Sequence, residues 1–272
     1  MTMSRAGPSS TIAEALSTQG RVVQALIMRE MKTRFGRQRL GYVWALIEPM
    51  IYVGIFMVLF SFRGREAPAG IPLLPFLITG VMPFMLFRDT VNRTLGSILS
   101  NRALLYFPQV TPFDLVIARA LLEAGTVSFV FGVFLIAAHL TDQTLRVERP
   151  LEVIGCFALA SALGLGLGTI FSSLAPLFAS IERLVPTVLL RPLFFTSGLF
   201  FTADMVPAGV RDLALLNPLL HVTELVRSAL FVGFESEYAD PQYPLRMALV
   251  LVFLGLTLQR ALRRRVLTAI QG

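Results

Sequence analysis

Six long, predominantly apolar segments divide the sequence, and they limit the folds that the chain can adopt. A helix rises about 1.5 Å per residue, so about 20 apolar residues are needed to cross the roughly 30 Å of hydrocarbon in a bilayer. Because lipid offers the backbone no hydrogen-bond partners, segments of this kind are expected to be helical. We therefore expect an all-α membrane protein, with a single transmembrane domain over residues 1–272 and six transmembrane helices at residues 42–62, 71–87, 113–139, 153–177, 184–203 and 245–262.

The overall composition also favours a membrane protein over a soluble one. Hydrophobic residues make up 55% of the chain and charged residues only 15%. The formal net charge is +7, which in a soluble chain would point to nucleic acid as a partner. Here the basic residues flank the apolar segments, so we expect no nucleic-acid partner and attribute the charge to orientation in the bilayer.

Six spans place both termini on the same side of the membrane. If that side is the cytoplasm, basic residues flanking the spans are about twice as numerous inside as outside, which favours an N-in, C-in orientation. Residues 1–20 contain no apolar segment of the kind that a cleavable signal peptide needs. We therefore expect the first span itself to direct insertion.

Two segments outside the expected spans have the pattern of membrane-associated helices. Residues 11–35 alternate apolar and polar positions at roughly helical spacing, which predicts an amphipathic helix along the cytoplasmic interface. Residues 204–235 are rather apolar, but prolines divide them into pieces too short to span. We expect two short re-entrant periplasmic helices there, between spans five and six. Two helices lying flat on the outer surface are the alternative.

The loop before the third span carries a helix-start signal. Thr111, Pro112 and Asp114 have the residue types of an N-cap, a first-turn proline and an early acid. The third span is therefore expected to begin there. Residues 102–107 are left over as a separate short cytoplasmic helix.

Large side chains and one acid recur every four residues in the first span, at Trp44, Glu48, Tyr52, Phe56 and Phe60. Each step of four residues advances a helix by about 40° beyond a full turn, so these side chains form one slowly winding stripe. Aromatic faces can stack against sugars, bases or lipids, but they also commonly face lipid or neighbouring helices. A carboxylate at this depth is costly in contact with lipid, so we expect Glu48 to face a cavity or a basic partner.

The fifth expected span holds a cluster of phenylalanines near its outer end, at Phe194, Phe195, Phe200 and Phe201. They suit either an aromatic girdle at the interface or the aromatic lining of an exit. Arg191 lies in the same span. It is expected either to extend to the cytoplasmic surface or to meet an acid across the bundle.

Two spans carry further short patterns. In the third span Arg119 and Glu123 are four residues apart, which predicts an ion pair on one helix face. In the fourth span Gly164, Gly166 and Gly168 follow one another at every second position. No lysine follows them, so we expect close helix packing there and not a phosphate-binding loop.

The sequence lacks the signatures of a nucleotide-hydrolysing or metal-dependent enzyme. No G-x-x-x-x-G-K-[ST], H-E-x-x-H or G-x-S-x-G motif occurs. The single cysteine, Cys156, and the two histidines, His139 and His221, predict neither an intrachain disulfide nor a metal site. A membrane-embedded glycan-transferring enzyme is the alternative class. It would need a cluster of acids facing the cytoplasm, whereas the acids in the expected inner loops of this chain are scattered.

Several motifs occur in a characteristic order. G-Y-V-W-A-L-I-E-P opens the first span, I-E-R-L-V-P precedes the fifth, F-F-T-S-G-L-F-F lies within it, and N-P-L-L-H-V-T-E-L-V-R follows it. Together with the basic N-terminal helix and the short helix before the third span, this order resembles the membrane subunit of a type-2 ABC exporter over nearly the whole chain. The chain is most similar to the capsular polysaccharide export (Kps-type) permeases, with O-antigen and teichoic acid permeases as near relatives.

This resemblance implies a multi-pass homodimer in the inner membrane, with the pore between its subunits, and two soluble ATP-binding subunits. ATP and Mg would be bound by those partners, so no cofactor is expected in this chain, which is itself non-catalytic. In the family, a short cytoplasmic helix docks on the ATPase. The corresponding coupling residues here are Arg102, Leu104, Leu105, Tyr106 and Phe107.

The resemblance also implies a substrate and a path. The substrate is a lipid-linked capsular polysaccharide, and further partners are a periplasmic adaptor or copolymerase and an outer-membrane exit protein. Export of O-antigen or teichoic acid polymer, or of a small molecule or lipid, is the alternative. The expected path is lined by Trp44, Glu48, Tyr52, Phe56, Phe60, Phe194 and Phe195. A cationic entrance is expected at Arg34, Arg37 and Arg39, and a periplasmic gate at Pro207, Asn217, Pro218 and Arg227.

Overall fold

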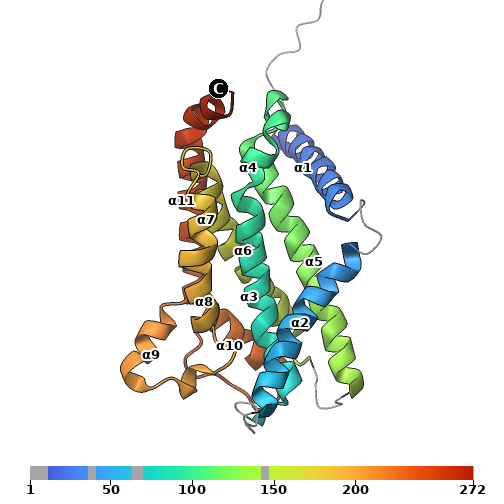
Figure 1. Cartoon of the computed structure of the whole chain (residues 1–272), viewed down its shortest axis with the longest axis vertical. Helices are drawn as coiled ribbons and strands as arrows, with labels where there is room; N and C mark the ends of the chain where they lie inside the picture. Colours follow the sequence, from blue (N-terminus) through green and yellow to red (C-terminus); the bar gives the residue numbers. More distant parts are fainter. Residues whose placement is uncertain (1–11, 36–40, 63–69, 142–146, 272) are drawn as a thin grey trace, which may run out of the picture.

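The computed structural model of the chain describes residues 12–35, 41–62, 70–141 and 147–271, and every regular element in these ranges is helical (Figure 1). Within them, five helices are long and apolar enough to cross a membrane. These are α2 (Gly41–Phe62), α3 (Leu73–Leu95), α5 (Pro112–Thr141), α6 (Pro150–Leu174) and α11 (Gln242–Gln271). The expected all-α fold with several membrane-spanning helices is therefore confirmed.

Two of these helices are longer than the apolar segments that predicted them. α3 continues to Leu95, although its span was expected to end at residue 87, and α11 covers Gln242–Gln271 in place of 245–262. The extension of α3 carries two arginines and that of α11 carries three. Backbone hydrogen bonding does not require apolar side chains, so a helix can continue past the hydrocarbon where hydropathy alone would end it.

The segment expected as the fifth span is helical, but it is not one regular helix. It consists of α7 (Ile181–Leu184), the π-helical η3 (Val185–Leu190) and α8 (Arg191–Thr196), with 4, 6 and 6 residues. At about 1.5 Å per residue these pieces cover about 24 Å. Pro186 and Pro192 each lack an N–H donor, which accounts for the wide turns between them. The expected end at residue 203 is wrong, because the helix stops at Thr196. The sixth crossing stays a prediction.

α3 lies at the centre of the bundle, where it packs against α2, α5, α6 and α10. Of the most apolar part of α3, 83% is buried, against only 11% for α2. The glycines of α6 allow its close approach to two neighbours. A Cβ added to Gly164 would lie 2.8 Å from Thr90 of α3, and one added to Gly166 would lie 2.6 Å from Leu251 of α11. The expected packing role of these glycines is confirmed.

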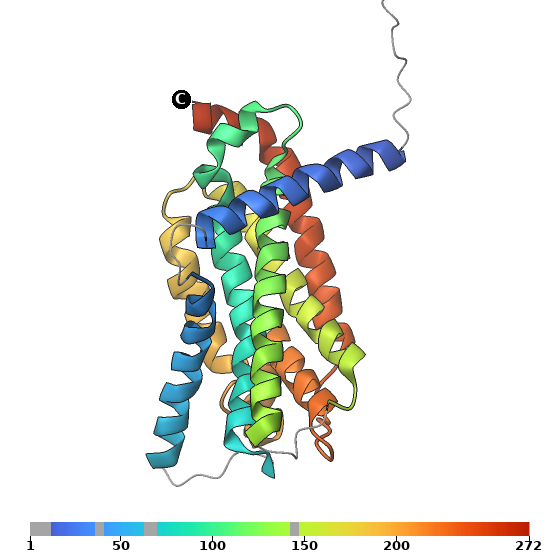
Figure 2. The same cartoon turned by 90° about the vertical axis from the view of Figure 1, so that its right-hand side faces the viewer.

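One end of the bundle carries an additional helix that crosses it. α1 (Ile12–Phe35) runs across the outside of α5 at a steep angle to the long helices (Figure 2). Leu26 of α1 packs against Leu115 and Ala118 of α5. The short α4 (Ser97–Ser100), the 3-10 turn η2 (Arg102–Tyr106) and the C-terminal end of α11 lie at the same end (Figure 2).

The opposite end of the bundle holds two short helices that follow the turn η4 (Ala203–Met205). α9 (Ala208–Leu215) has no buried side chain, whereas α10 (Pro218–Leu230) packs against α3, α6 and α11. These helices occupy the stretch where two short elements were expected. The difference in their burial means that α10 belongs to the core and α9 lies beside it (Figure 1).

Candidate functional site

A cavity of about 320 Å³ lies where α2, α3 and the η3–α8 segment meet. This volume falls at the lower end of the range of ligand pockets. Aromatic and aliphatic side chains form most of its wall, and two arginines and an amide complete it. The lining residues are Tyr52, Phe84, Arg88, Asn92, Pro186, Leu190, Arg191, Phe194 and Phe195.

Phe194 is the centre of the aromatic part of this cavity. Its ring centroid lies 5.4 Å from that of Phe84 and 5.2 Å from that of Phe195, with both pairs edge to face. Phe56 and Phe200 extend the cluster. Their ring centroids lie 4.1 Å apart, and they lie 6.1 and 5.4 Å from the centroid of Phe194. Such spacings are typical of stabilising aromatic pairs. The predicted stripe of α2 and the phenylalanine cluster of the fifth segment are thus joined in one aromatic surface.

Arg88 anchors the polar side of the cavity. Its guanidinium pairs with Glu48 at 2.8 Å and with Asp89 at 2.8 Å, and it donates a third hydrogen bond to the Tyr52 hydroxyl at 3.1 Å. The basic partner expected for Glu48 is therefore present. Because one arginine ties α2 to α3 through a carboxylate and a phenol, these contacts also hold the Tyr52 ring in place at the cavity wall.

Arg191 and Asn92 have a different character. Neither side chain makes a hydrogen bond or ion pair with any residue in the part of the chain that the structure describes, and both line the cavity. Arg191 was expected to reach the surface or to meet an acid; its side chain is exposed, and no acid contacts it within that part. An ionisable side chain at membrane depth that faces a cavity is a candidate for substrate contact.

Comparison with known proteins agrees with this architecture. The family model described as "ABC-2 type transporter" matches residues 21–231. The chain belongs to the ABC-2 type transporter family. It is 34% identical to the polysialic acid transport protein KpsM of Escherichia coli over 247 residues, which cover 91% of this chain and 95% of that protein.

Two further relatives have a similar extent. The capsule polysaccharide export inner-membrane protein CtrC of Neisseria meningitidis serogroup B is 31% identical, with 90% of this chain and 92% of that protein covered. The protein of the same description from Haemophilus influenzae, BexB, is 30% identical, with 93% and 95% covered. All three match this chain along nearly its whole length.

Within this ABC-2 subunit the expected path residues fall into two groups. Tyr52, Phe194 and Phe195 line the cavity, and Glu48 and Phe56 contact residues that line it. Trp44 is 61% exposed and does not line the cavity. Phe60 is half-buried and does not line it either.

Among the polar residues of the cavity, sequence reasoning missed Arg88 and Asn92. Arg88 entered that reasoning only as a flanking positive charge. The signal that could have found both is spacing, because Phe84, Arg88 and Asn92 are four residues apart and therefore share one face of α3.

The residues expected to couple this ABC-2 subunit to an ATPase lie in η2, a short 3-10 helix, and just after it, where a short helix was expected over 102–107. Leu104 and Leu105 pack against the apolar cluster between α1 and α5. Tyr106 and Phe107, by contrast, are 68% and 60% exposed, and Arg102 is exposed as well. The turn thus has an anchored side and a free aromatic side.

An ion-pair network joins α1 to the bundle, and it corrects one expectation. Arg119 pairs with Glu30 of α1 at 2.9 Å, and Glu123 pairs with Arg34 of α1 and with Arg93 of α3. The predicted pair between Arg119 and Glu123 is therefore wrong. The i,i+4 rule considers one helix alone, whereas here a second helix brings its own charges to that face.

These contacts also bear on the expected cationic entrance. Arg34 is engaged with Glu123, a buried acid, so it fixes α1 to α5. Arg37 and Arg39 lie outside the residues that the structure describes.

Arg227, expected at the periplasmic gate, is fully buried in the core. Its guanidinium donates to the carbonyl oxygens of Phe201, Leu199 and Phe76 at 3.1 to 3.5 Å and pairs with Glu224 at 3.4 Å. It also lies 3.8 Å from the centroid of the Phe76 ring. Burial lowers the pKa of Arg227 to about 10, which leaves it charged at neutral pH. Its contacts are those of a lock that holds α10 against α3.

Asn217 and the two gate prolines define the ends of the short helices. Asn217 caps α10 by accepting a hydrogen bond from the Leu219 N–H at 3.0 Å. Its amide also donates to the hydroxyls of Thr196 and Ser197 at 2.9 and 3.0 Å, which connects α10 to the end of α8. Pro207 and Pro218 stand at the starts of α9 and α10, where a missing N–H costs no helical bond.

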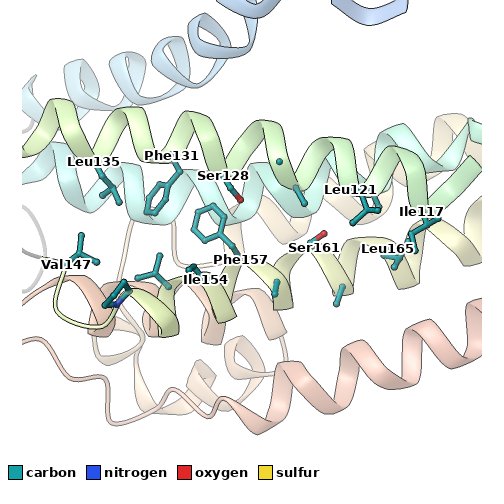
Figure 3. A pocket seen from close by; sticks show the side chains of 18 residues that line it. Ile117, Leu121, Ser128, Phe131, Leu135, Val147, Ile154, Phe157, Ser161 and Leu165 are labelled. Carbon is teal, nitrogen blue, oxygen red and sulfur yellow. The ribbon is translucent and has the colours of Figure 1, made fainter. Parts of the chain in front are cut away.

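A second, larger cavity is apolar and lies between α5 and α6. Its volume is about 680 Å³, and its lining includes no ionisable side chain. Figure 3 shows Leu135, Phe131 and Leu121 of α5 facing Ile154, Phe157 and Leu165 of α6 across it. Ser128 and Ser161 are its only hydroxyl-bearing lining residues. It offers no ionisable group that would recognise a charged ligand.

Proposed function

We propose that this chain is the membrane subunit of an ATP-driven exporter that moves lipid-linked capsular polysaccharide across the inner membrane. Membership of the ABC-2 family supports the transporter class, and the similarity to the polysaccharide transport proteins KpsM, CtrC and BexB supports the substrate class. The observation that carries the proposal is the cavity of Tyr52, Phe194 and Phe195 beside Arg191. Aromatic faces can pack against sugar rings, and a cation suits an acidic polymer.

The proposed topology has six crossings with both termini in the cytoplasm. The η3–α8 segment supplies the crossing that is not a regular helix, and α9 and α10 form the periplasmic gate region, dipping into the outer leaflet. The basic residues of α1 and of the end of α11 support this orientation, because cytoplasmic flanks of spans are enriched in Lys and Arg. α10 is too short to span and is buried in the core against α3, α6 and α11, which supports re-entrance.

Two copies of the chain and two soluble ATPase subunits complete the proposed transporter. ATP and Mg belong to the ATPase, and this chain is non-catalytic. The low burial of α2 leaves a face with large exposed side chains such as Ile55 and Phe62, which can contact either lipid or a second copy. A periplasmic adaptor and an outer-membrane exit protein are further proposed partners.

Export is tested in cells that produce an acidic capsule. Deleting the gene for this chain is expected to abolish surface polymer and to leave lipid-linked polymer in the cytoplasm, and the wild-type chain should restore export. Radiolabelled or antibody-detected polymer in the two fractions is the measurement. If the deletion leaves the capsule intact and instead shortens lipopolysaccharide, the chain exports O-antigen. If neither polymer changes, the proposed substrate class is wrong.

ATPase coupling is tested at the free side of η2. The double substitution Tyr106→Ala and Phe107→Ala is expected to abolish co-purification of the ATPase, because both side chains are exposed while Leu104 and Leu105 keep the turn anchored. Leu216→Ala, at the opposite end of the bundle and similarly exposed, is the matched control. An ATPase that still co-purifies at wild-type stoichiometry with the double variant would place the coupling surface elsewhere.

A further inference from the structure

The unpartnered cation in the aromatic cavity points to a ligand with a particular chemistry. Arg191 lies ten residues after the start of α7 at Ile181, which corresponds to about 15 Å along a helix. A guanidinium at that depth is costly unless an anion or a polar environment faces it. No residue in the described part of the chain supplies either through a hydrogen bond or ion pair. Because the Arg191 side chain is exposed, a group from outside that part of the chain can reach it.

Arg88 does not compete for this role. Its Nε, Nη1 and Nη2 atoms already donate to Asp89, Tyr52 and Glu48. Two carboxylates against one guanidinium leave this cluster without excess positive charge. Arg191 is therefore the cation of this lining that remains for a ligand, and Asn92 adds a neutral amide donor to the same lining.

The rest of the wall indicates what carries the anion. Phe194 and Phe195 follow Arg191 by three and four residues, and their rings lie edge to face. Tyr52 and Phe84, from α2 and α3, line the same cavity. Flat aromatic faces suit the C–H face of a sugar ring, and an acyl chain has no need of them. A sugar that bears an oxyanion matches both the cation and the aromatic side chains of the lining, whereas a neutral sugar or a simple lipid matches only one of the two.

We propose that Arg191 and Asn92 bind the oxyanion of an acidic sugar unit whose ring packs on Phe194 and Phe195. This inference rests on the proposed export function and deepens it, because it makes the cavity selective for acidic over neutral polymer. Arg191 supplies a charge-assisted hydrogen bond and Asn92 an amide N–H. Arg88 is a positioning residue that holds Tyr52 against the same unit.

The test uses the full chain with its ATPase in lipid nanodiscs and three fluorescent probes. These are a sialic acid oligomer, a neutral maltooligosaccharide of equal length, and a short-chain phosphatidylglycerol. The wild-type complex is expected to bind the sialic acid oligomer more tightly than the other two, by fluorescence anisotropy. Because a charge-assisted hydrogen bond is lost, Arg191→Gln should weaken that binding by about 10-fold or more. Arg191→Lys should restore most of it, and Asn92→Ala should weaken it by about threefold.

Arg183→Gln is the matched control. Arg183 is an exposed arginine of α7 that does not line the cavity, so the same charge change there should leave binding within about twofold of wild type. Equal losses for Arg183→Gln and Arg191→Gln would mean a general surface charge effect and would overturn the site. Tighter binding of the maltooligosaccharide or of the lipid than of the sialic acid oligomer would overturn the assignment to an acidic sugar, as would no binding of the sialic acid oligomer to the wild-type complex.

Experiments in cells separate this inference from the proposed function. If the deletion strain accumulates internal polymer but Arg191→Gln exports at the wild-type rate, the acidic-sugar site is wrong and the export function stands. If the deletion strain accumulates no polymer, the export function itself fails. Size-exclusion chromatography of Arg191→Gln checks the remaining interpretation. A smaller assembly than wild type would show that Arg191 pairs with a second copy and not with a sugar.

Discussion

Two arginines of this chain stand in opposite situations, and the contrast separates what holds the fold from what is available to a substrate. Arg227 of α10 is fully buried, and three carbonyl oxygens, the Glu224 carboxylate and the Phe76 ring surround it. Arg191 of α8 faces a cavity and has no hydrogen-bond or ion-pair partner among the described residues. Groups within the fold compensate the charge of Arg227, whereas the charge of Arg191 is left for a group outside the described part of the chain.

Arg88 lies between these two extremes. It lines the same cavity as Arg191, yet it has three polar partners from α2 and α3. The ends of α3 therefore differ. The carbonyl oxygen of Phe76 accepts a hydrogen bond from the buried Arg227, whereas the side chain of Arg88 lines the open cavity. From this gradient we expect stability to be most sensitive at Arg227 and transport to be most sensitive at Arg191.

The largest expected effect is on the stability of the Arg227 lock. Arg227→Met should destabilise the protein by about 3–5 kcal/mol, because it leaves Glu224 buried without its counter-ion. Arg191→Met should change the free energy of unfolding by less than about 0.5 kcal/mol, because no described contact is lost. Thermal unfolding in detergent, followed by intrinsic fluorescence or light scattering, measures both.

The double variant Arg227→Met with Glu224→Gln is the internal control for this difference. Removing the uncompensated carboxylate should recover part of the lost stability. If Arg227→Met unfolds at the wild-type temperature, or if Arg191→Met is the more destabilised of the two, the contrast between a locked and a free arginine does not hold.

The membrane spans and the ion pairs between helices differ in how far the sequence could predict them. The spans were predictable because hydrocarbon imposes length and composition on any helix that crosses it. The partner of Glu48 was predictable in kind, since a carboxylate at that depth needs a cation or a cavity. Its identity was not, because Arg88 lies 40 residues further along the chain and only the packing of α2 on α3 brings the two together.

The errors have the same origin in tertiary contacts. The i,i+4 rule paired Arg119 with Glu123, but α1 supplies Glu30 and Arg34 to those two residues. Arg227 was placed at the gate as the last residue of the N-P-L-L-H-V-T-E-L-V-R motif, and that role stays a prediction. Its burial against Phe76 was not foreseen, because it depends on a contact across 151 positions of the sequence. A local pattern cannot report contacts of that range.

An intermediate effect is expected at Arg88. Glu48→Gln keeps a hydrogen-bond acceptor but removes one charge from a partly exposed pair, so it should cost about 1 kcal/mol. Tyr52→Phe removes only the hydroxyl that accepts from Arg88 and should cost about 0.5–1.5 kcal/mol. Thermal unfolding measures each, and Asp89 remains to hold the guanidinium in both variants.

The double variant then tests whether the three contacts act together. Glu48→Gln with Tyr52→Phe should be destabilised by an amount that differs from the sum of the single effects, because both partners bind the same guanidinium. Strict additivity would indicate that Glu48 and Tyr52 act independently and that Arg88 does not position the Tyr52 ring.

The smallest effect on stability, and the one that decides the fate of the predicted stripe, is expected at Trp44. Trp44 and Tyr52 are two turns apart on α2, but only Tyr52 lines the cavity, and Trp44 is 61% exposed. Trp44→Ala should change the free energy of unfolding by less than about 0.5 kcal/mol, as is usual for exposed positions. Tyr52→Ala should reduce polymer export at an unchanged protein level, and Trp44→Ala should reduce it much less. Surface polymer normalised to membrane-bound protein is the measurement.

If the two variants lose export equally, then the whole stripe contacts the polymer and the path extends beyond the cavity towards the N-terminal end of α2. If neither loses export, the aromatic side chains of α2 serve packing alone, and the cavity wall formed by α3 and α8 has to carry recognition without them.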